Sequence, residues 1–177
     1  MRNPYEVLGV DPKAELKEIK AAYKRKAQAA HPDREGGSAE EMESLTWAWG
    51  ILQDVDKRAF WDAFGAELGP EGLAGEGKRE AERALLSAVD LSGNMLQHAR
   101  QVILDRQEAG PLTIRHLEAS RKRAEGHLKR LSGGSGRVQS AISGGIEAIR
   151  MEIAKEQWIN RVMSHAMDEL SQYGYLS

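Results

Sequence analysis

The chain has 177 residues, of which 41% are hydrophobic and 29% are charged, a balance that suits a globular protein of one medium domain or two small ones. Its formal net charge of −2 argues against a protein that binds nucleic acid over its whole surface, so an electrostatic partner would need a local patch. Because cysteine is absent, disulfides and cysteine-ligated zinc are excluded, and a reducing compartment is compatible with the composition.

The sequence shows no targeting or membrane-spanning pattern. The N-terminus has a single basic residue with no apolar stretch behind it, and no apolar run approaches the roughly 20 residues that cross a bilayer. We therefore expect a cytoplasmic protein that has no membrane partner. Strand-like alternation and internal repeats are also missing from the sequence, so the hydrophobic periodicity predicts an all-α fold.

Two helices are predicted at the start of the chain. Asn3 fits a helix N-cap, with Pro4 behind it at the first helical position, and Gly9 ends this short helix. A second helix is predicted from Lys13 to Ala30. Its apolar stripe repeats at spacings of three and four residues and consists of Leu16, Ile19, Tyr23, Ala27 and Ala30.

Two further helices follow within residues 1–65. Ser38 and Glu41 have the spacing of a capping box, which predicts the start of a third helix, and a fourth is predicted from Asp54 to Gly65. The second and third helices should pack antiparallel as a hairpin, because a short loop joins them. The third helix is expected to bury Met42, Leu45, Trp49 and Leu52, with Trp47 at the flank of the core.

A His-Pro-Asp tripeptide, residues 31–33, follows the second helix directly. Proline disfavours the helical conformation at the residue before it and fixes its own φ, so the helix must end at His31 and the loop is held rigid. The imidazole and the carboxylate would then point outward. An isolated tripeptide of this kind is more simply explained as a helix stop, so its context decides the interpretation.

That context identifies a family. Residues 3–65 resemble the J domain of DnaJ-type co-chaperones over its full span, with the tripeptide placed at the end of a basic helix. The resemblance implies a four-helix J domain in residues 1–65 and a non-enzymatic protein that needs no cofactor. It would bind a DnaK-type seventy-kilodalton heat-shock chaperone and stimulate its ATP hydrolysis. The matching segments are residues 3–10, 19–27, 31–34, 49–54 and 56–62.

The resemblance also implies which residues contact the chaperone. In the family the basic second helix docks on a negative surface of the nucleotide-binding domain. The loop reaches the junction with the substrate-binding domain, where its Asp pairs with an arginine. Between Lys13 and Lys26 this chain has six basic and two acidic residues, as such docking requires. The chaperone-binding residues implied are His31, Pro32, Asp33, Tyr23, Lys20, Lys24, Arg25 and Lys26.

Two residues depart from the pattern of the family. Lys26 stands where an apolar residue is usual, and Ala30 stands where a larger aromatic residue is usual. The stem of Lys26 should pack against the core while its ammonium reaches toward solvent. We therefore expect a loosely packed end of the hairpin, next to the His-Pro-Asp loop.

The rest of the chain resembles no family. Residues 66–77 are rich in glycine and lack basic residues, which predicts a linker. Residues 78–177 predict a helical hairpin or three-helix coil, interrupted at Pro111 and at the glycine-rich stretch 133–136, with a last helix from Arg137 to Leu170. The first of these helices should bury Leu85, Val89, Leu96, Ala99 and Ile103.

Several functions stay open for residues 78–177. They could direct the chaperone to an unidentified client or location, or mediate self-association, which would make the chain a structural or assembly protein that uses the J fold for docking. Residues 111–137 contain seven basic and two acidic residues. We interpret these charges first as a solvated face, and second as a contact for nucleic acid or an acidic protein. No histidine pair or glycine-rich loop here has metal-binding or phosphate-binding spacing.

Overall fold

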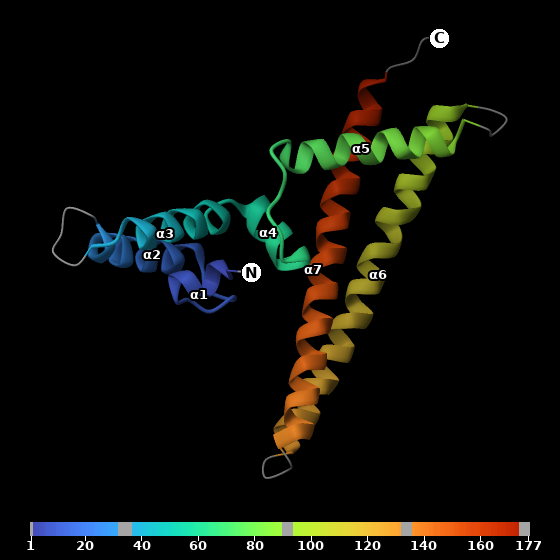
Figure 1. The fold of residues 1–177 in the computed structure, drawn as a ribbon. Helices are drawn as coiled ribbons and strands as arrows, with labels where there is room; N and C mark the ends of the chain where they lie inside the picture. Colours follow the sequence, from blue (N-terminus) through green and yellow to red (C-terminus); the bar gives the residue numbers. More distant parts are fainter. Residues whose placement is uncertain (1, 32–36, 90–93, 132–135, 174–177) are drawn as a thin grey trace. The chain divides into compact units, whose positions relative to one another are not determined.

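A computed structural model describes residues 2–31, 37–89, 94–131 and 136–173. These residues form seven helices and no strand, which confirms the all-α fold (Figure 1). The chain divides into two compact units, an N-terminal unit of residues 1–61 and a C-terminal unit of residues 62–177. The helices are α1 (Pro4–Leu8), α2 (Leu16–Ala30), α3 (Ala39–Leu52), α4 (Val55–Phe64), α5 (Gly72–Ser87), α6 (Met95–Arg130) and α7 (Gly136–Gln172).

The short helix α1 begins and ends as the sequence predicts. The side chain of Asn3 accepts a hydrogen bond of 3.0 Å from the backbone N–H of Tyr5, and Pro4 occupies the first turn. At the other end, Gly9 has φ +65° and donates its N–H to the carbonyl of Glu6. Only glycine adopts this left-handed conformation without strain, so the residue at position 9 fixes where the helix stops.

Helix α2 begins at Leu16 rather than at Lys13. The side chain of Asp11 accepts the backbone N–H of Lys13 at 2.7 Å, and its carbonyl accepts that of Ala14 at 2.8 Å. This local turn competes with the helix and delays its start. As a result Leu16 is 46% exposed and does not belong to the buried stripe that the spacing predicted.

The core of the N-terminal unit lies between α1, α2 and α3, with α2 and α3 forming the predicted antiparallel hairpin (Figure 1). Trp47 packs against the flank of this core and makes an edge-to-face contact with Trp61, as expected of a core residue. Met42 and Trp49 are only half-buried. The buried residues are Tyr5, Leu8, Ile19, Ala30, Leu45, Ala48, Ile51 and Leu52.

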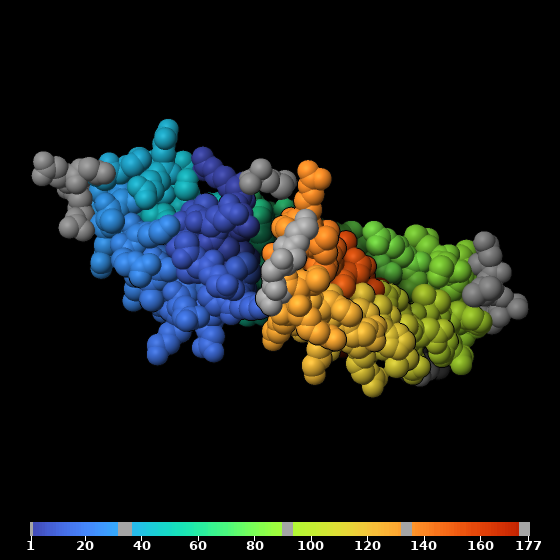
Figure 2. Space-filling model, turned by 90° about the horizontal axis from the view of Figure 1, so that it is seen from below, coloured from blue at the N-terminus to red at the C-terminus, as the bar shows by residue number. Residues whose placement is uncertain are grey.

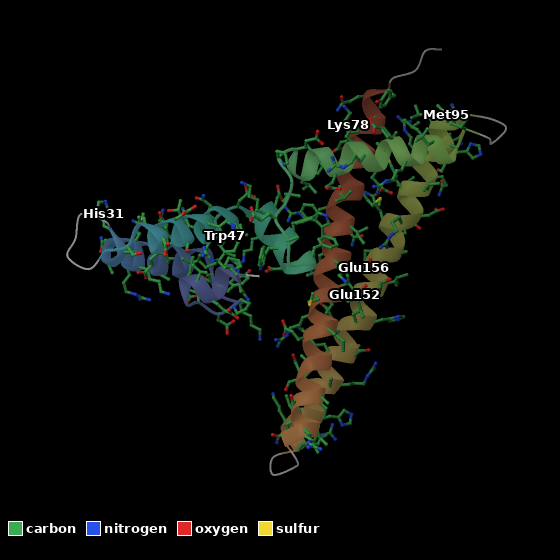
Figure 3. All side chains as sticks on the ribbon, in the orientation of Figure 1. His31, Trp47, Lys78, Met95, Glu152 and Glu156 are labelled. Carbon is green, nitrogen blue, oxygen red and sulfur yellow. The ribbon has the colours of Figure 1, made fainter. Side chains whose placement is uncertain are left out.

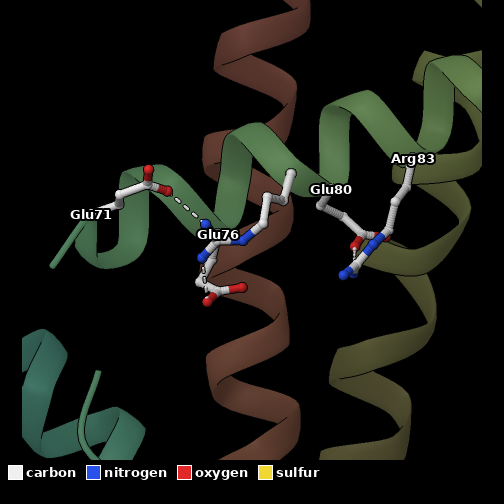
Figure 4. A network of polar contacts seen from close by, with 5 residues as sticks. Glu71, Glu76, Glu80 and Arg83 are labelled. Atoms are coloured by element: carbon white, nitrogen blue, oxygen red, sulfur yellow. Dashed lines mark hydrogen bonds and ion pairs between the residues drawn. The ribbon is translucent and has the colours of Figure 1, made fainter. Parts of the chain in front are cut away.

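The segment between α4 and α5 is shorter than the linker predicted over residues 66–77. Helix α5 begins at Gly72, so residues 72–77 are helical despite their glycines. Arg79 joins Glu71 and Glu76 across this first part of the helix, with N–O distances of 2.6 and 2.7 Å (Figure 4). Leu73 and Gly77 are buried, so tertiary packing overrides the low helix propensity of glycine.

Helix α5 also ends earlier than the predicted apolar stripe requires. It stops at Ser87, and α6 begins at Met95 with the side chain of Asn94 capping the N–H of Gln97 at 3.1 Å. Val89 lies between the two helices and is 59% exposed, so its assignment to a buried stripe was wrong. Of the remaining members, Ala99 and Ile103 are buried on α6, and Leu85 and Leu96 are partly buried against the same core.

Helix α6 continues through Pro111, where the sequence predicted an interruption. Proline lacks the N–H that would bond the carbonyl of Gln107, a loss of about 3 kcal/mol in a helix interior. Packing against α7 holds the helix together here. Arg106 donates to both carboxylate oxygens of Glu156 on α7 at 3.0 and 2.9 Å, and Gly110 lies directly against Asn160.

Together α6 and α7 form a long antiparallel hairpin, and α5 packs on its open end (Figure 1). The extent of α7 confirms the helix predicted from Arg137 to Leu170. None of the helices in the described part of the chain is long and apolar enough to cross a membrane. The core of this unit consists of Ala81, Ala84, Ala99, Ile103, Met163, Ala166 and Leu170.

The crossing of α5 over α7 depends on a glycine. A Cβ atom at Gly77 would lie 2.4 Å from Cβ of His165 and 3.1 Å from the backbone nitrogen of Ala166. Both atoms belong to the rigid part of α7, so neither can move aside cheaply. The two helices can therefore approach this closely only because residue 77 has no side chain.

This contact yields a prediction on stability. Gly77→Ala should lower the free energy of unfolding by about 1–3 kcal/mol, because the added methyl overlaps α7. Gly144→Ala is the matched control, since Gly144 lies in the interior of α7 with nothing within 4 Å of its Cβ position. It should raise the free energy of unfolding by up to about 1 kcal/mol, the helix preference of alanine over glycine.

The measurement is urea unfolding of the full chain, followed by far-ultraviolet circular dichroism. Equal stabilisation by the two substitutions would show that α5 does not pack on α7 at Gly77.

Candidate functional site

The surface of α2 carries the basic residues that the sequence singled out. Lys20, Lys24 and Arg25 are exposed, as is Lys17. The acidic residues of this segment lie at the opposite end of the helix, where the N–H of Glu15 donates to the carboxylate of Glu18 at 2.8 Å. Carboxylates at a helix N-terminus are favoured by the helix dipole. The half of α2 that leads to His31 therefore presents positive charge without a carboxylate beside it on this helix.

Tyr23 lies beside this positive surface. It is half-buried, and its ring stacks on Trp49 of α3 with centroids 5.1 Å apart and planes 12° from parallel. Stacking of this kind is worth about 0.5–1.5 kcal/mol beyond the buried area. The stack fixes the tyrosine ring between the core and the exposed face of α2.

His31 ends α2 as the sequence predicted. Its φ of −59° and ψ of 127° are extended rather than helical, and the residue is exposed at the end of the helix (Figure 3). The backbone N–H of Ser38 donates to the carbonyl of Ala30 at 3.1 Å, which joins the end of α2 to the start of α3. Pro32 and Asp33 lie outside the described residues.

The structure corrects the expectation for Lys26. Its ammonium does not reach toward solvent but donates to the backbone carbonyl of Val7 at 2.7 Å. That carbonyl belongs to the last turn of α1, where carbonyls lack a partner within the helix. The nitrogen of Lys26 also lies 3.3 Å from the Cβ position of Gly9. Lys26 therefore ties α1 to α2, which compensates for the apolar side chain that it replaces.

Ala30 also does not leave the end of the hairpin open. It is 2% exposed and belongs to the core of the N-terminal unit. The backbone N–H of Ser38 also donates to the carbonyl of Ala30, which joins this end of α2 to the start of α3. The loosely packed hairpin end was predicted from Lys26 and Ala30, and the structure shows both residues engaged within the N-terminal unit.

Arg58 has a role that the sequence did not reveal. Its guanidinium donates to the hydroxyl of Tyr5 at 3.0 Å and to the carbonyls of Pro12 and Ala14 at 3.0 and 2.9 Å. It also lies 5.5 Å from the centre of the Tyr5 ring. One side chain of α4 thus joins α1 to the turn that starts α2. The sequence offered only the family segment 56–62 as a signal, without a role for this arginine.

The described part of the candidate site presents its charged groups at the surface. No group of three or more metal-ligating side chains occurs among the residues that the structure describes, and no charged or polar residue in them is fully buried. What the helix presents is a row of cations leading to an exposed imidazole. Such a surface suits an acidic partner, whose approach it would orient by charge.

The geometry of Arg58 leads to a prediction on the N-terminal unit. Arg58→Lys should lower its free energy of unfolding by about 1–3 kcal/mol, because one ammonium cannot span three acceptors in the planar arrangement of a guanidinium. Lys57→Gln, one residue earlier and exposed, should change it by less than about 0.5 kcal/mol. Thermal unfolding of the full chain measures both values, and equal small effects would contradict the bridging role of Arg58.

Comparison with known proteins gives the same assignment for this part of the chain. The model of the DnaJ domain family matches residues 3–62. The chaperone protein DnaJ of Staphylococcus aureus (strain bovine RF122 / ET3-1) is 41% identical over 77 residues, which are 42% of this chain and 20% of that protein. Chaperone protein DnaJ 1 of Cutibacterium acnes is 49% identical over 74 residues, which are 41% of this chain and 19% of that protein.

A third relative, the chaperone protein DnaJ of Methanothermobacter thermautotrophicus, is 43% identical over 77 residues, which are 42% of this chain and 20% of that protein. The chain thus matches about a fifth of the length of these curated relatives. No solved structure matches the chain. The residues matched by the family model, 3–62, include the core of the N-terminal unit, helix α2 and the His-Pro-Asp tripeptide. Residues 3–62 of the chain therefore match the DnaJ domain family, and the comparisons assign no family to the rest of the chain.

Proposed function

We propose that this protein is a co-chaperone that binds a DnaK-type heat-shock chaperone and stimulates its ATP hydrolysis, without enzymatic activity of its own. The observation that carries the proposal is the exposed positive face of α2, which leads to an exposed His31 within a DnaJ domain. Three relatives over these residues are named chaperone protein DnaJ. The lack of cysteine is compatible with action in the cytoplasm.

The residues of the proposed contact divide into two groups. Lys20, Lys24 and Arg25 would orient the domain on an acidic surface, with the ring of Tyr23 held beside them by its stack on Trp49. The tripeptide of residues 31–33 would act on the chaperone itself. We leave Lys26 out of the docking group, because its ammonium is bonded to Val7 within the domain.

The C-terminal unit would decide what the chaperone is brought to. The matched segments of the relatives cover 41–42% of this chain, so more than half of its residues lie outside them. The unit exposes large apolar side chains around the α5–α6 turn, among them Leu86, Val89 and Met95. Exposed apolar groups are what a client contact or self-association uses. We therefore assign this unit to recognition of a client or assembly.

The proposed mechanism predicts the effect of changing the tripeptide. His31→Gln should abolish the stimulation of ATP hydrolysis while leaving the fold intact, because His31 is exposed and outside the core. The measurement is single-turnover ATP hydrolysis by a DnaK-type chaperone with wild type and variant. Gln28→Ala, an exposed change one turn earlier on α2, is the matched control and should stimulate like wild type. Equal stimulation by wild type and His31→Gln would contradict the proposal.

The charged face predicts a dependence on salt. Lys20→Gln with Lys24→Gln should weaken binding to the chaperone by about 2-fold to 30-fold at low ionic strength, from about 0.2–1 kcal/mol for each exposed charge. The difference from wild type should shrink as salt is added, because exposed charges are screened. Titration calorimetry at two salt concentrations measures this. A loss of affinity that is the same at both concentrations would show that the lysines do not act through their charge.

A further inference from the structure

The far end of the α6–α7 hairpin concentrates positive charge. Residues 115–150 contain eight basic and three acidic residues, whereas the whole chain has a formal net charge of −2. The described part of this end consists of the last half of α6 and the first half of α7, which lie side by side (Figure 2). The basic residues are Arg115, Arg121, Lys122, Arg123, Lys129, Arg130, Arg137 and Arg150.

Five of these cations share one face of α6. Arg115, Lys122 and Lys129 are spaced by seven residues, and Arg123 and Arg130 repeat the same spacing beside them. Seven residues correspond to two helical turns, so equivalent charges recur about every 10.5 Å along the helix. All five are exposed, whereas Ile114, Leu117 and Leu128 on the opposite side of α6 are half-buried. We call these five residues the α6 cation face.

The α6 cation face is not neutralised within the protein. Among the described residues, none of its five members forms an ion pair with a carboxylate. Its arginines instead donate to neutral groups of their own helix. Arg115 bonds the carbonyl of Pro111, Arg123 the hydroxyl of Ser120, and Arg130 the carbonyl of Gly126, with distances of 3.3, 3.0 and 3.1 Å respectively.

Other arginines of the same unit behave differently. Arg79 and Arg83 on α5 pair with glutamates of their own helix or its N-cap (Figure 4), and Arg106 pairs with Glu156 across the hairpin. At the far end itself, Glu125 is contacted by Arg121 and Arg150, neither of which belongs to the α6 cation face. Glu125 is thus already engaged, and Glu118, which lies at the edge of the face between Arg115 and Lys122, forms no ion pair with the five cations. Five cations beside this one carboxylate leave the face with a net positive charge for an external anion.

We propose that the α6 cation face binds the phosphate backbone of double-stranded nucleic acid, without reading its sequence. The face extends over about 20 Å of straight helix with a regular repeat, which suits a linear array of phosphates. Residues 111–150 contain no phenylalanine, tyrosine or tryptophan, so a single strand finds no large ring on which to stack its bases and gains little there. The positions between the charges are small, Ala119 and Gly126, and offer an acidic protein no apolar anchor.

This proposal is independent of the co-chaperone activity, because it concerns residues outside the DnaJ domain. The test is fluorescence anisotropy of a labelled 20-base-pair duplex of arbitrary sequence, titrated with the full chain. Binding with a dissociation constant of about 10⁻⁶–10⁻⁴ M at physiological salt is expected, as for other non-specific complexes. With five phosphate contacts, affinity should fall about 500-fold between 50 and 200 mM salt.

Three double variants locate the binding surface. Lys122→Gln with Lys129→Gln should weaken duplex binding at 50 mM salt by at least about tenfold and reduce the salt slope by about 2. Lys78→Gln with Arg83→Gln removes the same charge from α5, and Lys20→Gln with Lys24→Gln removes it from the DnaJ domain. Both controls should keep the salt slope of wild type. Circular dichroism should be unchanged in all three, because the substituted side chains are exposed.

Several results would overturn the proposal. The first is an absence of duplex binding by wild type at physiological salt, which would leave the face as a solvated surface. The second is an equal loss of binding in a control variant, or a loss only in the DnaJ-domain variant. The third is displacement of the duplex by polyglutamate at the same concentration of charge, which would assign the face to acidic proteins instead.

Discussion

The end of α2 at Ala30 is the constraint on which the N-terminal unit depends. A proline at position 32 denies the helical conformation to His31, whose backbone is extended. The chain must leave the helix there, and the bond from Ser38 to Ala30 returns it to α3. The antiparallel hairpin, its core and the exposed imidazole all follow from this one stop. The same local rule that ends the helix therefore presents the residue on which the proposed function depends.

Features that depend on neighbouring residues could be predicted from the sequence. Contacts between residues far apart in the sequence could not. Asn3 and Gly9 act on their own neighbours, so the limits of α1 could be read from the sequence. Lys26 was misjudged because its partner, Val7, lies on another helix. Pro111 was expected to interrupt a helix, but α6 continues through it. The ion pair from Arg106 to Glu156, which helps to hold α6 against α7 there, joins residues fifty positions apart and could not be foreseen. Such long-range compensation has no signature in a single sequence.

The candidate site shows the same division. The tripeptide and the basic residues of α2 were found from their spacing and from a family resemblance, which the match over residues 3–62 confirmed. The bridge from Arg58 to Tyr5, Pro12 and Ala14 was missed, because nothing in the sequence distinguishes it from the exposed Lys57 beside it. The residues proposed to act at the surface could therefore be named from the sequence, whereas the residue that supports their fold could not.

The central claim is that α2 and His31 form the surface that meets the chaperone, and hydrogen–deuterium exchange tests it most directly. The full chain would be labelled alone and in the presence of an ATP-bound DnaK-type chaperone. The account predicts slower exchange in α2, Leu16–Ala30, and unchanged exchange in the α6 cation face. Slower exchange confined to α5, α6 or α7, with α2 unaffected, would contradict it.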